Sequence, residues 1–333
     1  MKKKLATLTA LALTAMMAFT GCGGGSNEAA EQDSENATGG AVELTLGTGG
    51  TTGTYYAVGG TMSTVLNNAM ENVSLKVVST GASKTNILDI DDKVSDVAIV
   101  QNDVMYYAYN GTDLFAAEGK FDTFSAVAGI YDETCQIIAG PGITSIADLK
   151  GKTVNVGDAG SGVEFNATQI LAAYGIDINK DINKVNGSFG DAADSIKDGK
   201  IDAAFITAGA PTTAVVDLAI SKSIQLLTID DEHADALIAE YPFYTKTVIP
   251  GGTYNGVADD VQTLSVRATL IAANDVSEDT IYELTKALFE NKDALASSNA
   301  KFAELDPAAA IQGISVPFHP GAEKYFKEIG VLS

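Results

Sequence analysis

A run of glycines and threonines, TGGTTG at residues 48–53, has the residue types that could hold a small anion. It lies between a short apolar strand, LTLG, and a helical stretch that begins near Tyr55. Glycine lets the backbone approach a ligand closely, and threonine hydroxyls and the free N–H groups of a helix N-terminus donate hydrogen bonds. The spacing therefore predicts an anion-binding loop at the end of a strand.

Three more loops of small residues follow predicted strands in the same way. They are Gly81-Ala82-Ser83, the loop 158–162 with the sequence DAGSG, and the loop 208–213 with the sequence AGAPTT. Another predicted strand, DVAIVQND, ends in polar residues at 101–103. Ligands of open α/β sheets bind at the carboxyl ends of the strands, so we expect these segments to line one site.

Enzymatic interpretations of these loops are incomplete. The glycines of residues 47–53 do not match the G-x-G-x-x-G of a dinucleotide site, and Ser79-Thr80-Gly81 stands where an acidic ribose ligand is needed. TGGTTG resembles the TGGTIAG start of bacterial asparaginases, and NGTD at 110–113 resembles their HGTD motif. Asparagine replaces that histidine, and no lysine in a matching motif supplies the base that a hydroxyl nucleophile requires. We expect a protein that is not an enzyme, with an asparaginase-like amidohydrolase as the open alternative.

The first 41 residues have the features of an export signal. Residues 1–4, MKKK, are basic, and residues 5–19 are apolar but shorter than the roughly 20 residues of a membrane span. Small residues precede Cys22 as in the bacterial lipoprotein box, which this segment resembles, and a polar stretch follows. We predict a signal peptide at 1–21, a flexible tether at 22–41, and a lipid anchor at Cys22. The protein is then extracytoplasmic, on the outer face of the cell membrane or in the periplasm.

The chain is strongly acidic. Its 333 residues carry a net charge of −22, and removal of residues 1–21, with three lysines and no acidic residue, makes it −25. This charge disfavours nucleic acid and anionic lipid as partners, but it does not identify the charge of the ligand. After Cys22 only Cys135 remains, so an internal disulfide is excluded, and its apolar context predicts a buried thiol. His233 and His319 lie in unrelated contexts, which argues against chemistry that needs paired histidines.

The elements that position the loops alternate between strand and helix, which predicts parallel sheets covered by helices. About 290 residues follow the tether, enough for two domains or one two-lobed unit. Residues 88–101 and 195–207 share a pattern of helix end, acidic turn and small apolar strand, as in two lobes built alike. Residues 127–139 and 249–275 contain long extended segments that can run between such lobes.

Seven blocks after the tether resemble, in order, the TAXI family of TRAP-transporter solute-binding proteins. They are TLGTGGTTGTYYAVGGTMSTVL, STGASKTNILDI, DVAIVQND, SIADLKGKTVNVGDAGSGVEFNATQIL, IPGGTYNGVADDVQTLSV, YELTKALFENKDAL and HPGAEKYFKEIGVL. The resemblance implies a two-lobed periplasmic-binding-protein fold of the type II-like kind, each lobe a mostly parallel sheet flanked by helices, with the ligand cleft between the lobes. We expect lobe 1 at 42–137 plus 248–333 and lobe 2 at 138–247.

The resemblance also implies a function in transport. The protein would bind a small carboxylate, such as glutamate, glutamine or a four- or five-carbon dicarboxylate, by hinge closure and deliver it to the membrane subunits of an ion-coupled TRAP permease. A substrate-binding lipoprotein of an ABC importer is a further alternative. We expect a monomer without a cofactor or a bound metal.

The residues and the resemblance point to one set of candidate ligand-binding positions. They are Thr48, Gly49, Gly50, Thr51, Thr52, Gly53, Tyr55, Thr80, Ser83, Asn86, Gln101, Asp103, Ser161 and Gly162. Backbone N–H groups and hydroxyls would hold a carboxylate, Tyr55 would wall the site, and Asp103 could accept an amino group. Asp158 does not suit an anion loop, because an unpaired carboxylate repels a carboxylate ligand. Arg267, the only arginine, could clamp a carboxylate, but we expect it to face solvent or the hinge.

Overall fold

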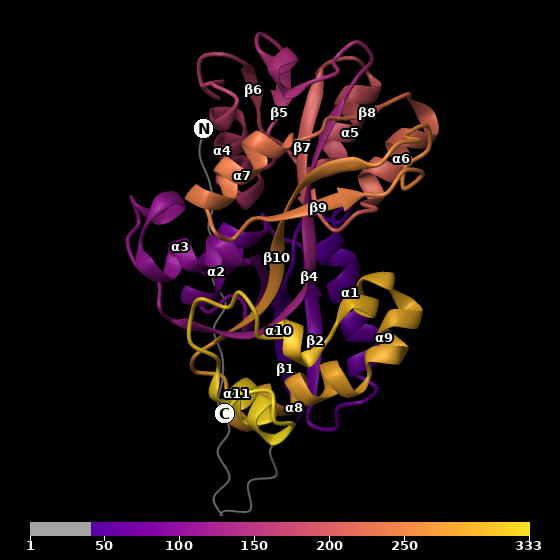
Figure 1. Cartoon of the computed structure of the whole chain (residues 1–333). Helices are drawn as coiled ribbons and strands as arrows, with labels where there is room; N and C mark the ends of the chain where they lie inside the picture. Colours follow the sequence, from indigo (N-terminus) through magenta and orange to yellow (C-terminus); the bar gives the residue numbers. More distant parts are fainter. Residues whose placement is uncertain (1–40) are drawn as a thin grey trace, which may run out of the picture. The chain divides into compact units, whose positions relative to one another are not determined.

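The computed structural model describes residues 41–333, in which ten strands form one mixed sheet (Figure 1). Eight of these strands follow the order β2-β1-β3-β10-β4-β7-β5-β6, while β8 pairs with β4 and β9 pairs with β10. The predicted signal peptide, the lipid anchor at Cys22 and the tether as far as residue 40 lie outside the described residues. Within residues 41–333, no helix is both long and apolar enough to cross a membrane.

The first part of the sheet is parallel, and its middle strand leads into the predicted anion loop. Its strands are β1 (Val42–Gly47), β2 (Val73–Val78) and β3 (Val97–Gln101). The helical segments that follow these strands are α1 (Thr54–Leu66), α2 (Ser83–Asp91), α3 (Asn102–Asn110) and the short 3-10 helix η1 (Asp113–Phe115). Each strand therefore ends next to the N-terminus of a helix.

The second part of the sheet repeats this construction. Its parallel strands are β5 (Thr153–Asn155), β6 (Asn183–Val185) and β7 (Ala203–Ala208), with β5 in the middle. Its helical segments are η2 (Ile146–Leu149), α4 (Gly162–Ala173), α5 (Phe189–Lys197), α6 (Thr213–Ser221) and α7 (Asp231–Glu240). The similarity between residues 88–101 and 195–207 falls on β3 and β7, which occupy equivalent places in the strand order.

Two long strands, β4 (Phe124–Ala139) and β10 (Val261–Ala273), join the two parts (Figure 1). They pair antiparallel with each other, and β10 also pairs with β3 while β4 also pairs with β7. A strand of 16 residues such as β4 extends about 53 Å at about 3.3 Å per residue. The sequence predicts a separate sheet for each lobe, but β4 and β10 pair with the edges of both parallel parts and make one continuous sheet. The short strands β8 (Gln225–Leu226) and β9 (Thr245–Ile249) extend the pairing.

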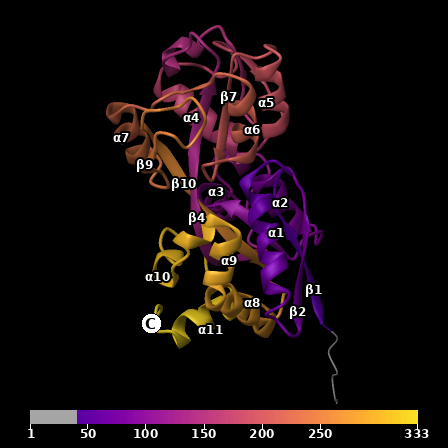
Figure 2. The same ribbon diagram turned by 90° about the vertical axis from the view of Figure 1, so that its right-hand side faces the viewer.

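The helices after β10 pack against the first part of the sheet (Figure 2). They are α8 (Glu278–Glu290), α9 (Lys292–Ser298), η3 (Ala300–Glu304), α10 (Pro307–Ala310) and α11 (Pro320–Glu328). One apolar cluster joins them to the earlier elements, because Phe302 and Phe326 are fully buried together with Leu46 and Met62. Further apolar clusters fill the spaces between the second part of the sheet and its helices. The predicted α/β fold class, a sheet flanked by helices, is confirmed.

Candidate functional site

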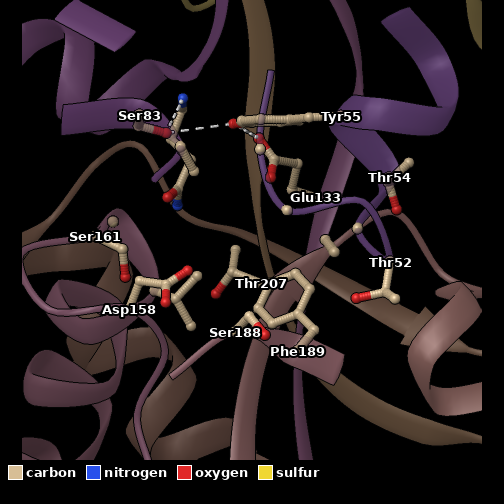
Figure 3. A pocket seen from close by; sticks show the side chains of 18 residues that line it. Thr52, Thr54, Tyr55, Ser83, Glu133, Asp158, Ser161, Ser188, Phe189 and Thr207 are labelled. Carbon is tan, nitrogen blue, oxygen red and sulfur yellow. Dashed lines mark hydrogen bonds between the residues drawn. The ribbon is translucent and has the colours of Figure 1, made fainter. Parts of the chain in front are cut away.

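A cavity lies at the carboxyl ends of strands from both parts of the sheet (Figure 3). Its walls come from residues that end or follow β1, β2 and β3, from residues that end or follow β5, β6 and β7, and from Glu133 of β4. The lining residues are Gly49, Gly50, Thr52, Gly53, Thr54, Tyr55, Ala82, Ser83, Gln101, Glu133, Asp158, Ser161, Gly162, Val163, Ser188, Phe189, Thr207 and Ala208. The volume open to the centres of water-sized molecules is about 40 Å³, which suits a few waters or one small compound.

The N-terminus of α1 reaches this cavity through Gly53, Thr54 and Tyr55. Gly53 is the N-cap residue, and within the described chain no side chain caps this helix and no acidic residue lies in its first turn. The first N–H groups of a helix have no acceptor inside the helix and form the positive end of its dipole. This wall therefore offers free donors and a polarity that favours an anionic group.

The opposite wall is formed by the loop between β5 and α4. Ser161 caps α4, because its hydroxyl oxygen accepts the N–H of Glu164 at 3.2 Å, and the Glu164 carboxylate accepts the N–H of Gly160 at 2.6 Å. Gly160 has a φ of +76°, a left-handed conformation that glycine adopts without strain. The hydroxyl of Ser161 can still donate its hydrogen to a ligand, because capping uses only the oxygen as an acceptor.

The two walls approach each other closely through small residues. An ideal Cβ placed on Gly162 lies 1.8 Å from Oε1 of Gln101, so no side chain fits at this position. Gln101 Nε2 donates to Asn166 Oδ1 at 2.7 Å, which links the end of β3 to α4. Thr54 Oγ1 donates to the carbonyl of Gly209 at 3.0 Å, which links α1 to the loop after β7. These contacts show a closed arrangement of the two parts around the cavity.

A buried carboxyl group, that of Glu133, forms part of the cavity wall. Glu133 is 2% exposed, and its Oε1 accepts the hydroxyl hydrogen of Tyr55 at 2.6 Å (Figure 3). Ser83 Oγ lies 3.4 Å from the same hydroxyl oxygen. Burial raises the pKa of Glu133 well above its usual range, while the hydrogen bond from Tyr55 lowers it and the charges of Asp103 and Asp132 raise it further. Glu133 therefore favours its neutral form while the cavity holds no positive group.

The wall carries a second acid, Asp158, whose pKa is raised by partial burial and by the charge of Asp191. Among the described residues that line the cavity, none is a lysine or an arginine. Arg267 lies elsewhere, on β10, where its Nη1 donates to Oδ1 of Asp132 at 3.0 Å. The formal charge of the cavity wall thus comes from carboxyl groups alone.

Most of the predicted ligand-binding residues line the cavity. They are Gly49, Gly50, Thr52, Gly53, Tyr55, Ser83, Gln101, Ser161 and Gly162.

Four of the other predicted residues do not line the cavity, and three of these hydrogen-bond to the backbone of the loops. Thr48 donates its hydroxyl hydrogen to the carbonyl of Val78 at 2.6 Å. Thr80 and Asn86 donate to the Thr48 carbonyl at 2.9 and 2.7 Å. Thr51 is exposed, in the turn before α1. Threonine and asparagine bond to the backbone as readily as to a ligand, so the residue types could not separate these two roles.

Asp103, predicted to accept an amino group of the ligand, also lies outside the cavity lining. Its carboxylate accepts hydrogen bonds from Val104 N at 2.8 Å and from Asn166 Nδ2 at 3.0 Å. Burial raises its pKa to about 6, although these hydrogen bonds lower it. Asp103 therefore belongs to a buried polar network between α3 and α4.

Several lining residues were missed by the sequence analysis. They are Glu133, Ser188, Phe189 and Thr207. Ser188 and Phe189 follow β6, whose three residues are all exposed, so no apolar pattern reveals that strand. Glu133 lies in a strand whose residues are all buried except Asp132, and an acid inside such an apolar strand was the signal that could have found it.

Other candidate chemistry lies away from this cavity. Residues 110–113, the NGTD segment, do not contribute to its lining. Within residues 41–333, no cluster of three or more histidine, cysteine, aspartate or glutamate side chains has an arrangement that could hold a metal ion. Cys135 is buried, as predicted, and burial raises its pKa to about 12.

Residues 46–330 match the NMT1-like family. A protein of known structure from Bordetella bronchiseptica RB50 is similar, with a TM-score of 0.52 and 18% identity over 87% of this chain and 89% of that chain. The periplasmic aliphatic sulphonate binding protein SsuA from Escherichia coli has a TM-score of 0.49 and 14% identity over 86% and 82% of the two chains. A putative L-cystine ABC transporter from Listeria monocytogenes has a TM-score of 0.49 and 16% identity over 78% and 95%. At such identities the likeness concerns the fold alone.

Proposed function

We propose that this chain, which belongs to the NMT1-like family, is an extracytoplasmic solute-binding protein that captures a small molecule for a membrane transporter. The observation that carries the proposal is the cavity at the carboxyl ends of strands from both parts of the sheet. A ligand in this cavity contacts both parts at once, so binding stabilises the closed arrangement over an open one. The protein acts as a receptor and not as an enzyme.

The ligand we propose is a small carboxylate, such as glutamate, glutamine or a short dicarboxylate. Its carboxylate accepts hydrogen bonds from the N–H groups at Gly49–Thr52 and the first turn of α1. Ser161 and Gly162 contact it from the second wall, and Tyr55 encloses it. The cavity volume supports a small ligand in the closed form.

Closure is proposed as a hinge motion between lobe 1, residues 42–137 plus 248–333, and lobe 2, residues 138–247. With these bounds the chain passes from one lobe to the other twice, within β4 and within β9, and β9 pairs with the long strand β10. These strands can bend while the parallel strands on either side move as units. The transporter then distinguishes the closed, loaded receptor from the open one.

The transporter we propose is a TRAP-type permease, on the strength of the resemblance to TAXI proteins. Cys22 is the proposed lipid attachment site that holds the receptor at the outer face of the membrane. A neighbouring gene for a large membrane protein with many helices supports this assignment. A neighbouring gene for a P-loop ATPase contradicts it and favours an ABC importer.

Thermal unfolding with a panel of small acids tests the proposed function. Glutamate, glutamine, 2-oxoglutarate and succinate each compete for the same donors, and the true ligand should stabilise the fold by about 2.7 kcal/mol at a hundredfold excess over Kd. The proposed ligand class is wrong if none of these acids changes the unfolding temperature. Release of ammonia from asparagine or glutamine would instead establish the amidohydrolase alternative.

A further inference from the structure

The cavity has a positive helix terminus on one wall and a buried acid beside it. Tyr55, in the first turn of α1, connects the two, because its hydroxyl donates to Oε1 of Glu133 at 2.6 Å. Within residues 41–333, this is the one side-chain hydrogen bond that the Glu133 carboxyl group makes. The N-terminus of α1, which favours an anion, and the carboxyl group of Glu133, which favours a cation, are thus linked through the side chain of Tyr55.

The lysines near the cavity do not neutralise Glu133. The side chain of Lys84 lies close to Gly160, but its Nζ donates to Glu118 at 2.7 Å and to the carbonyl of Leu114 at 3.1 Å. Lys301 lies beside Gly209 and pairs with a glutamate of its own helical turn. Within the described chain, Glu133 therefore forms no ion pair. A buried carboxylate without a positive partner is costly, so a charged partner must come from the ligand if Glu133 is to ionise.

We propose that the ligand presents a protonated amino group to Glu133 while its carboxylate lies at the N-terminus of α1. The receptor thus binds an α-amino acid in preference to a dicarboxylate or an oxo acid. This inference rests on the proposed function and specifies its substrate class. An amino acid carries both an anionic and a cationic group, as these two parts of the cavity wall require. Asp158, on the opposite wall, adds to the preference for a ligand with a positive group.

Binding should then release a proton. The ionisable groups around Glu133 are Tyr55 on α1, Asp103 on α3, and Tyr131, Asp132 and Cys135 on its own strand. Burial is the largest single influence on the pKa of Glu133. Burial favours the neutral form of Glu133 in the empty receptor, and an ammonium group lowers its pKa, so a proton should leave as the amino acid binds. The affinity for an amino acid therefore rises with pH across this titration. A dicarboxylate would require the protonated form of Glu133, and its affinity would fall with pH.

The test is isothermal titration calorimetry of the full chain with two matched pairs, glutamate against 2-oxoglutarate and aspartate against succinate. Titrations run at several pH values and in buffers of different ionisation enthalpy. We expect at least one amino acid to bind tenfold or more tightly than its partner without the amino group, with proton release. The substitution Glu133→Gln keeps the shape and the acceptor for Tyr55 but removes the charge, and it should abolish both the preference and the proton release.

Asp132→Asn is the matched control. Asp132 is next to Glu133 in the sequence, but it pairs with Arg267 and does not line the cavity, so this variant should keep the preference. Thermal unfolding of each variant without ligand verifies that it is folded.

Three results overturn the inference. If oxo acids or dicarboxylates bind and amino acids do not, the ligand class is wrong, although a small-carboxylate receptor stands. If Glu133→Gln retains the amino-acid preference of the wild type, Glu133 does not recognise the ammonium. If no compound of either class binds, the inference and the proposed ligand class both fail.

Discussion

Substitution of Gly162 by alanine should hold the two parts of the protein apart. The added Cβ would lie 1.8 Å from Oε1 of Gln101 and 2.9 Å from Cγ2 of Val104, whereas real Cβ contacts essentially never fall below 3.0 Å. The oxygen would have to move by at least the difference, 1.2 Å, to reach even that limit. Gln101 cannot move freely, because it is 2% exposed and its amide donates to Asn166 at 2.7 Å.

The magnitude follows from the two ways in which the clash can be relieved. Overpacking in a well-packed site costs about 1–3 kcal/mol, and a buried amide that loses its partner costs a similar amount. This penalty applies to the closed form and not to an open one. It therefore shifts the equilibrium towards the open form and weakens ligand affinity by about 5-fold to 150-fold, at 1.4 kcal/mol per factor of ten.

Calorimetry with glutamate and small-angle X-ray scattering provide the assay. Gly162→Ala should show weaker binding and a larger radius of gyration, with thermal unfolding still cooperative. Gly60→Ala is the control, because Gly60 lies in α1 with no atom within 4 Å of its ideal Cβ. Unchanged affinity and an unchanged radius of gyration in Gly162→Ala would refute the role of this close contact in closure.

Three further predictions address stability and the site boundary. The pKa of Asp103 is raised from 3.8 to about 6, so its contribution to stability is complete below pH 3.8 and is lost as pH rises through 6. The full loss is about 3 kcal/mol at about 1.4 kcal/mol per pH unit, so the stability difference between wild type and Asp103→Asn in urea should change by about 2 kcal/mol between pH 4 and 6, and a constant difference contradicts the assignment. Arg267→Gln should change the affinity for glutamate less than twofold in calorimetry, because Arg267 pairs with Asp132 outside the cavity; a tenfold loss would instead identify a carboxylate clamp. Phe302→Ala should lower the free energy of unfolding by about 3–5 kcal/mol, because Phe302 is fully buried in the cluster that joins the C-terminal helices to the first part of the sheet. Ile220→Ala, at a side chain that is 72% exposed, should change it by less than about 0.5 kcal/mol, and equal effects in denaturant titrations would exclude this packing.

Local patterns allowed much of the fold to be predicted. The alternation of strands and helices, the glycine and threonine loop before α1, and the similarity of residues 88–101 and 195–207 are all visible over short stretches. The joining of both parts by β4 and β10 into one sheet was not predicted, because strand pairing depends on segments far apart in the chain. β10 pairs Arg267 with Asp132, for example, across 135 positions of sequence.

The chemistry of the first wall follows from the sequence, because glycine, threonine and a helix start in succession predict backbone donors at Gly49–Thr52 and at the start of α1. The residues opposite and beside that wall are set by long-range packing. Tyr55 reaches Glu133 across 78 positions, and Gln101 reaches Asn166 across 65. Such contacts depend on how the strands cross and how closely the helices approach, which residue types do not encode locally. The same folding that brings Glu133 into the cavity turns Asp103, the acid predicted to bind the ligand, towards α4.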